Sequence, residues 1–185
     1  MSVTRPDVRL VPLSLEHAPA MFRWMEDPEV RLGVGIRATP SLERTQGWIA
    51  QALERGSGMF PFAILEGDAH VGNVVLDRLD SHLSTVRLSI YVGESSCRGR
   101  GVGQAAVRLA LAHAFEQLGL YKVWLTVHAE NEAARRMYTV LGFQEEGRLR
   151  GEFLLAGRRV EAIYMGVLAS EFHARNPRGG EELSP

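Results

Sequence analysis

Cys97-Arg98-Gly99-Arg100-Gly101-Val102-Gly103 lies between a strand pattern and a helix pattern. Before this stretch, apolar residues alternate at period two over residues 86–92, which predicts a half-buried strand. After it, apolar residues recur at helical spacing until Gly119, where a helix should end. A glycine-rich turn that opens a helix leaves backbone N–H groups unpaired, and the helix dipole adds partial positive charge there. Arg98 and Arg100 add positive charge at its rim. We therefore interpret the stretch, called the glycine turn below, as a binding site for a diphosphate.

Three nucleotide-binding patterns compete for this interpretation. A P-loop requires Gly-Lys-Ser/Thr at its end, but Gly103 is followed by Gln104. The dinucleotide fingerprint would place its third glycine at Gln104 and needs a later acidic residue, which residues 120–127 lack. The remaining pattern is Arg/Gln-x-x-Gly-x-Gly/Ala, which Arg98, Gly101 and Gly103 satisfy. Taken alone, the stretch could also be a plain flexible turn.

Composition is that of an ordinary globular domain. The chain has 185 residues, of which 45% are hydrophobic and 23% charged. A net charge of −1 argues against a nucleic-acid-binding protein. The single cysteine, Cys97, excludes an internal disulfide and a multi-cysteine metal site. No apolar run approaches the about 20 residues that span a bilayer, and the first residues lack the apolar core of a signal peptide. We expect a cytoplasmic protein that binds neither membranes nor nucleic acid.

The order of patterns along the chain predicts a mixed α/β (α+β) domain. A meander of antiparallel strands comes first, and helices alternate with strands after the glycine turn. Residues 29–40 have little periodicity and predict a mobile loop. We expect one domain over residues 7–172 and a flexible tail over 173–185. Strand patterns fall at residues 8–13, 59–65, 71–79, 86–92, 122–127, 143–150 and 159–167, and helix patterns at 14–25, 41–55, 102–118 and 131–141.

A second motif follows the strand pattern at residues 122–127. Asn131 is a good helix N-cap, and Gly142 is placed as a helix-ending residue. Asn131, Ala134 and Tyr138 share one helix face, because they lie at i, i+3 and i+7. The small Ala134 leaves a groove that a slender chain could occupy. The alternative is that Asn131 is only a cap and Tyr138 only a core residue.

The two motifs together resemble the GNAT acetyltransferases. The resemblance rests on Asn-x-x-Ala-x-x-x-Tyr and Leu141-Gly142-Phe143, placed after an Arg-x-x-Gly-x-Gly loop. The segments around residues 9–13, 24–30, 146–150 and 165–168 are similar to the RimJ/RimL-like branch. The resemblance covers residues 7–172. It implies a GNAT fold, with a mostly antiparallel sheet of about seven strands splayed in the middle and about four helices on its faces.

The resemblance also implies a site and a cofactor, acetyl-CoA. Backbone amides of the glycine turn would bind the coenzyme A diphosphate, and the preceding strand end would pair with the pantetheine amides. The N–H of Val92 would stabilise an oxyanion. Tyr138 would protonate the departing thiolate, and Asn131 would orient the cofactor arm or a water. No metal is required. The implied cofactor-binding residues are Ile90, Tyr91, Val92, Arg98, Gly99, Arg100, Gly101, Val102, Gly103, Asn131 and Arg135.

The general base is the point where the chain departs from its relatives. Many of them carry a Glu on the fourth strand, where this sequence has Arg87, with Ser89 next on that face. Glu94, His128 and Glu152 are candidates for the base. A water chain, or an amine that arrives neutral, would also suffice.

Two further features have competing interpretations. Cys97 could relay an acyl group, although a small loop filler is the simpler role. Arg31, Arg37, Arg148 and Arg150 lie in segments that flank the acceptor site in similar proteins. They could favour an acidic or phosphorylated acceptor, or simply form a solvated face.

The expected function is transfer of the acetyl group of acetyl-CoA to a primary amine of a small molecule or a protein N-terminus. A non-catalytic coenzyme A-binding module and an acyltransferase that uses another acyl-CoA are the alternatives. By similarity alone, the chain could form a homodimer. The sequence does not identify the amine.

Overall fold

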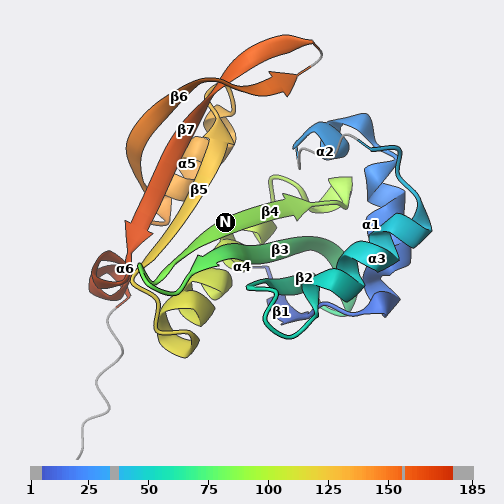
Figure 1. Ribbon diagram of the computed structural model, residues 1–185, viewed down its shortest axis with the longest axis horizontal. Coiled ribbons are helices and arrows are strands. Elements are labelled where there is room, and N and C mark those ends of the chain that lie inside the picture. Colours follow the sequence, from blue (N-terminus) through green and yellow to red (C-terminus); the bar gives the residue numbers. More distant parts are fainter. Residues whose placement is uncertain (1–5, 34–37, 156, 177–185) are drawn as a thin grey trace, which may run out of the picture.

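The computed structural model describes residues 6–33, 38–155 and 157–176. Seven strands follow one another in the order that the sequence patterns predict, with helices between them (Figure 1). The elements are β1 (Val8–Pro12), η1 (Leu15–His17), α1 (Ala18–Met25), α2 (Pro28–Gly33), α3 (Leu42–Ala52), β2 (Phe60–Glu66), β3 (Ala69–Asp80), β4 (Thr85–Val92), η2 (Ser95–Cys97), α4 (Val102–Ala112), the π-helical turn η3 (His113–Gln117), β5 (Lys122–His128), α5 (Glu132–Val140), β6 (Gln144–Leu155), β7 (Arg158–Leu168) and α6 (Ala169–Arg175).

The strands form one mixed sheet in the order β1-β2-β3-β4-β5-β7-β6. Strands β1 to β4 make an antiparallel meander, and β5, β7 and β6 are also antiparallel to one another. Only β4 and β5 run parallel. The expected sheet, mixed and mostly antiparallel with seven strands, is confirmed.

The parallel pair is short, and this splays the sheet. β4 and β5 pair only from Thr85–Lys122 to Arg87–Trp124. Beyond Arg87 the strands diverge, and Figure 1 shows the two halves of the sheet separating toward the ends of β4 and β5. The backbone groups of β4 that face β5 beyond this point therefore lack a neighbouring strand. We call the Arg87–Trp124 pair the vertex of the splay.

Alternating burial assigns the two faces of the sheet. Val86 and Leu88 on β4, and Val123 and Leu125 on β5, are at most 2% exposed. They belong to one core with residues of α4 and α5, so both helices cover the same face. A second core, which includes Trp24, Met25 and Ile49, joins α1–α3 to the opposite face of β1–β4. This opposite face continues past the vertex onto β5–β7. We call the part of it at and beyond the vertex the open face.

Two helical segments differ from the sequence-based expectation. Residues 28–33 form α2 where a mobile loop was expected, because Pro28 suits the first helical position and Val30 is the buried contact. Among the described side chains of α2 only Val30 is buried, and a six-residue segment is too short to produce a helical periodicity in the sequence. Residues 34–37 lie outside the described residues.

The second difference is α6, which continues through Arg175, past the expected start of the tail at residue 173. Its anchor is Phe172, only 4% exposed, whose ring lies 5.3 Å from that of Phe115. Residues 177–185 lie outside the described residues, so the expectation of a tail there stays a prediction.

Close contact between β3 and β4 yields a stability prediction. A Cβ on Gly72 would lie 2.4 Å from the backbone oxygen of Tyr91 and 3.0 Å from Cα of Val92. Because backbone cannot rotate away, Gly72→Ala should lower the free energy of unfolding by about 1–3 kcal/mol in urea titrations. The matched control is Gly47→Ala in α3, where nothing lies within 4 Å. It should raise the same free energy by about 0.5–1 kcal/mol. Equal effects at the two glycines would contradict this account.

Candidate functional site

The glycine turn has the backbone geometry of an open helix N-terminus. Gly99 and Gly101 have φ angles of 72° and 86°, in the left-handed region that favours glycine. Gly101 is the N-cap of α4, and no side chain caps the helix there. The N–H groups of the first helical turn therefore point out of the helix end without a side-chain acceptor. An anion placed there would receive several N–H donors and the helix dipole.

The arginines of the turn fasten it in place. Arg98 donates from Nε to the backbone oxygen of Val92 (3.1 Å) and from Nη2 to that of Gly93 (3.3 Å). Arg100 pairs with Glu66 at the end of β2, at 2.9 Å. Both side chains were expected to supply mobile positive charge at the rim. The structure instead uses them as ties to β4 and β2, and the uncapped end of α4 offers backbone N–H groups as candidate anion donors.

Cys97 is an unreactive filler under the turn. Its side chain is 6% exposed, and Sγ donates to Oε2 of Glu66 at 3.2 Å. Burial, and then the hydrogen bond to Glu66, raise the pKa of the thiol. The geometry therefore favours the filler role over an acyl-cysteine relay.

The α5 helix faces the glycine turn. A Cβ on Gly103 would lie 3.7 Å from Cγ2 of Val92 and 3.8 Å from Sδ of Met137. The first turn of α4, the end of β4 and α5 therefore meet at the mouth of the splay. Asn131 is the N-cap of α5, where its side chain accepts from the N–H of Ala134 at 3.1 Å. The predicted cap is confirmed, while a role for Asn131 toward a cofactor stays a prediction.

Tyr138 lies inside this junction. Its side chain is 8% exposed, and its ring packs edge-on against Phe143 at 5.5 Å. Burial raises the pKa of the phenol to about 12. Among the described residues, no hydrogen-bond partner of the hydroxyl is found. The hydroxyl is thus protonated, and its O–H is free to donate a hydrogen bond to a ligand.

The three residues at the end of β4 offer backbone rather than side chains. Ile90 and Val92 pack against the α4–α5 core. The hydroxyl of Tyr91 donates to Oδ1 of Asn73 at 3.0 Å, and its ring packs against Trp24 under α1. Any contact of this segment with a ligand in the splay therefore comes from its N–H and C=O groups.

Arg135 points away from the glycine turn. It donates to the backbone oxygen of Ala129 (3.2 Å) and pairs with Glu145 on β6 (2.8 Å). The Arg135 side chain is thus directed to β6, although its backbone N–H donates to the backbone oxygen of Asn131 at 3.0 Å. Its role toward a cofactor stays a prediction.

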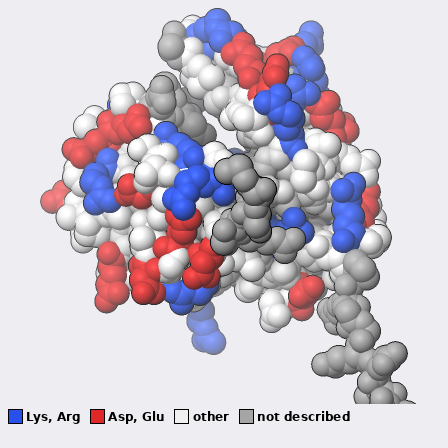
Figure 2. Space-filling model, turned by 180° about the vertical axis from the view of Figure 1, so that it is seen from behind, with Lys and Arg blue, Asp and Glu red and all other residues white. Residues whose placement is uncertain are grey.

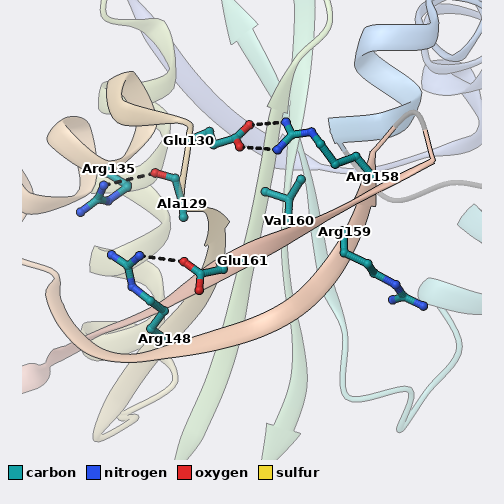
Figure 3. Close-up of a pocket in the computed structure, with 8 residues that line it drawn as sticks. All are labelled: Ala129, Glu130, Arg135, Arg148, Arg158, Arg159, Val160 and Glu161. Atoms are coloured by element: carbon teal, nitrogen blue, oxygen red, sulfur yellow. Dashed lines mark hydrogen bonds and ion pairs between the residues drawn. The ribbon is translucent and has the colours of Figure 1, made fainter.

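Arg135 instead borders a pocket of about 440 Å³ between the start of α5 and the β6–β7 hairpin (Figure 3). Two ion pairs occupy its walls: Arg158 holds Glu130 through two contacts of 2.7 Å, and Arg148 holds Glu161 at 2.7 Å. The Arg158–Glu130 pair ties the hairpin to the loop before α5. The pocket shares no lining residue with the glycine turn. Its lining residues are Ala129, Glu130, Arg135, Arg148, Arg158, Arg159, Val160 and Glu161.

The three candidate bases differ in their surroundings. Glu94 accepts from Arg23 (2.8 Å) and from Nε1 of Trp24 (2.9 Å), and these bonds lower its pKa. Glu152 is exposed on β6. His128 ends β5, on one arm of the splay, and burial lowers its pKa, so the imidazole is neutral at pH 7. Of these three, His128 combines a place on the splay with a state that accepts a proton.

Sequence reasoning missed the side chains at the vertex. Arg87 binds Asp77 through two contacts, of 2.8 and 2.6 Å. Across the vertex, Trp124 stacks on Tyr164 with ring centroids 5.0 Å apart. The β3–β4 hairpin could have revealed the first pair, because its register places residue 77 opposite residue 87. The second pair joins strands far apart in the chain, and no local pattern indicates it.

The surface charge and the lengths of the helices relate to the expectation that the protein binds neither nucleic acid nor membranes. Figure 2 shows basic and acidic side chains interspersed over the back face, with no field of one sign. Within the described ranges, no helix is long and apolar enough to cross a membrane, and no group of three or more His, Cys, Asp or Glu side chains could hold a metal ion.

The shielding of Cys97 can be tested by alkylation. The rate of reaction with iodoacetamide should rise with pH, and the midpoint of this rise should lie at a higher pH than for an unstructured cysteine peptide, because burial raises the thiol pKa. Unfolding in urea should remove the shift. A midpoint for the native protein at a lower pH than that of the peptide would instead indicate an activated thiolate.

Comparisons with known proteins place this chain among acetyltransferases. The family model described as Acetyltransferase (GNAT) domain matches residues 7–144. The spermidine N(1)-acetyltransferase of Escherichia coli (strain K12) is 37% identical over 86 residues, 46% of either chain. The putative ribosomal N-acetyltransferase YdaF of Bacillus subtilis (strain 168) is 28% identical over 101 residues, 55% of either chain. The aligned part of this chain spans about half the length of these curated relatives.

Solved structures share the fold. One of them is the spermidine N-acetyltransferase from Vibrio cholerae in complex with CoA and spermine, with a TM-score of 0.84 at 21% identity. The similarity covers 90% of this chain and 98% of that one.

Proposed function

Because this chain belongs to the GNAT acetyltransferase family, we propose that it transfers the acetyl group of acetyl-CoA to a primary amine. The observation that carries the proposal is the meeting of an uncapped helix N-terminus, at the glycine turn, with the unpaired end of β4 beside a splayed sheet. An anion site and an unpaired strand edge at one place suit a molecule that has a diphosphate and an amide-containing arm. The names of the relatives support the same activity.

In this proposal the backbone from Arg98 to Gly103 holds the diphosphate. The turn fits because its glycines leave the N–H groups uncovered and the arginine side chains are held elsewhere. The N–H and C=O groups of Ile90 lie on the splay side of β4 and would pair with the amides of the arm, as a strand would. The backbone of Tyr91 pairs with Asn73 on β3 instead, and the backbone oxygen of Val92 already accepts from Arg98. Bound there, acetyl-CoA supplies an acetyl group that its thioester already activates, so the reaction needs no metal.

Two protein groups would act on the reacting atoms. The N–H of Val92 would donate to the carbonyl oxygen as negative charge develops on it. The hydroxyl of Tyr138 would donate its proton to the leaving sulfur, because its raised pKa keeps it protonated. His128, neutral and on the opposite arm, is our choice among the candidate bases for the proton of the amine.

The finer placement of the protein is also a proposal. We assign it to the RimJ/RimL-like branch from its terminal segments, and a relative named as a ribosomal acetyltransferase supports this. A cytoplasmic, reducing location suits a chain whose single thiol is buried. Light scattering tests the homodimer that the resemblance suggests.

Calorimetry of coenzyme A binding tests the glycine turn. A side chain at Gly103 meets only ordinary contacts, so Gly103→Glu and Gly103→Gln should both fold. The two variants differ in one negative charge at the anion site. We expect the dissociation constant of the Glu variant for coenzyme A to exceed that of the Gln variant at least tenfold. The ratio of the two constants should fall as the salt concentration rises. No binding by the wild type would overturn the proposed function.

Removal of one hydroxyl tests the role of Tyr138. Tyr138→Phe should lower kcat about a hundredfold, the smaller end of the range for lost acid catalysis, while the dissociation constant of acetyl-CoA changes little. Since the folded-state pKa is about 12, the wild-type enzyme should show no loss of kcat from this group as the pH rises to about 10. Equal kcat values for the variant and the wild type would exclude this role.

A further inference from the structure

The vertex of the splay carries a cation that the proposed reaction does not use. Arg87 is the last residue of β4 that pairs with β5. Its neighbours Val86 and Leu88 are buried against the α4–α5 core, so the Arg87 side chain lies on the open face. Ser89, next on that face, is exposed, and the Arg87 side chain itself is 27% exposed. The described helices therefore leave this position open to solvent.

One edge of the guanidinium is occupied and the other is free. Asp77 accepts from Nε at 2.8 Å and from Nη2 at 2.6 Å, which occupies the side edge of the planar group. The end edge, formed by Nη1 and the second N–H of Nη2, has no acceptor among the described residues. Two parallel N–H donors at this edge match the two oxygens of a carboxylate or a phosphate. Asp77 fixes the orientation of the group and thereby directs the free edge.

An apolar wall stands across the vertex from this edge. Trp124 is the register partner of Arg87 and stacks on Tyr164 at an interplanar angle of 14°. Both aromatic side chains are half-buried, so part of each ring is available to a ligand. A cationic edge beside an aromatic wall suits a molecule with an anionic group and a nonpolar body.

Three carboxylates along the open face, among the described residues, already have cationic partners. Asp77 pairs with Arg87, and Glu146 pairs with Lys122 at 2.5 Å, next to Tyr164. At the end of β4, Glu94 pairs with Arg23. None of these three carboxylates is left to bind a polycationic acceptor.

We propose that Arg87 is a specificity-determining residue that binds an anionic group of the acceptor, so that the preferred acceptor is an amine carrying a carboxylate or phosphate. This inference rests on the proposed function and names the acceptor class of the same site. Arg87 lies three residues before Ile90, about 10 Å along the strand. The amine of such an acceptor would reach the end of β4 while its anion stays at the vertex. Asp77 is a positioning residue, because it acts through Arg87.

The test compares acceptors that differ only in charge. Amino acids from glycine to 6-aminohexanoate are paired with their carboxamides, O-phosphoethanolamine with ethanolamine, and spermidine serves as the polycation. The readout is the ratio of kcat/KM for the anionic member to that for its neutral partner. We expect at least one wild-type ratio of ten to a hundred, the range for a charge-assisted hydrogen bond. The carboxylate and phosphate series show which oxyanion the site prefers.

Variants show whether Arg87 causes the preference. Arg87→Gln should bring the ratio to about one, mainly by raising KM for the anionic acceptor, and Arg87→Lys should restore only part of it. Asp77→Asn should lower the ratio without removing it. The matched control is Arg9→Gln, which breaks an exposed pair with Asp68 at the far edge of the sheet and should keep the wild-type ratio.

The outcomes separate this inference from the proposed function. Turnover of neutral amines or spermidine in preference to every anionic amine would overturn the inference and leave the acetyltransferase proposal standing. An Arg87→Gln ratio equal to that of the wild type would do the same. Coenzyme A binding without turnover of any amine would overturn both.

Discussion

The early end of the parallel β4–β5 pairing is the constraint on which the site depends. Three residue pairs join the two halves of the sheet, and beyond them the backbone of β4 has no strand to pair with on that side. Backbone N–H and C=O groups that lose a ladder partner need another one. The divergence therefore leaves peptide groups of β4 without a strand partner on that side. The glycine turn, the start of α4 and the α5 helix all meet beside this end of β4.

Most charged side chains near the end of β4 have partners within the protein. Arg100 is paired with Glu66 and Glu94 with Arg23, while Arg98 keeps its charge and donates to backbone oxygens. These contacts hold the loops in place, so the proposed anion site consists of backbone dipoles on a fixed framework. A site of this kind is preorganised, because no side chain has to be immobilised when the ligand binds. At the vertex, Arg87 combines a two-contact pair with Asp77 and a second hydrogen-bonding edge for which the described residues offer no acceptor.

Local patterns were sufficient to predict much of the fold, the backbone of the glycine turn and the cap at Asn131. Alternation over residues 86–92 and 122–127 reflects one buried face, and the structure confirms both strands. The glycines at 99 and 101 were informative because their left-handed φ angles suit glycine. Helix α2 was missed because it is only six residues long, and the last turn of α6 because Phe172 is the one buried residue of that helix. Periodicity detects repeated burial, not single contacts.

The sequence by itself determined the order of the strands, the glycine turn, the cap at Asn131 and the family to which these belong. Only the tertiary structure decided which charged side chains are free. Arg100 meets Glu66 across 34 positions, and Arg135 turns to β6 and away from the turn. Trp124 meets Tyr164 only because β7 inserts between β5 and β6. Such pairings depend on strand order and register, which arise from packing of the whole sheet, so no local stretch of sequence contains them.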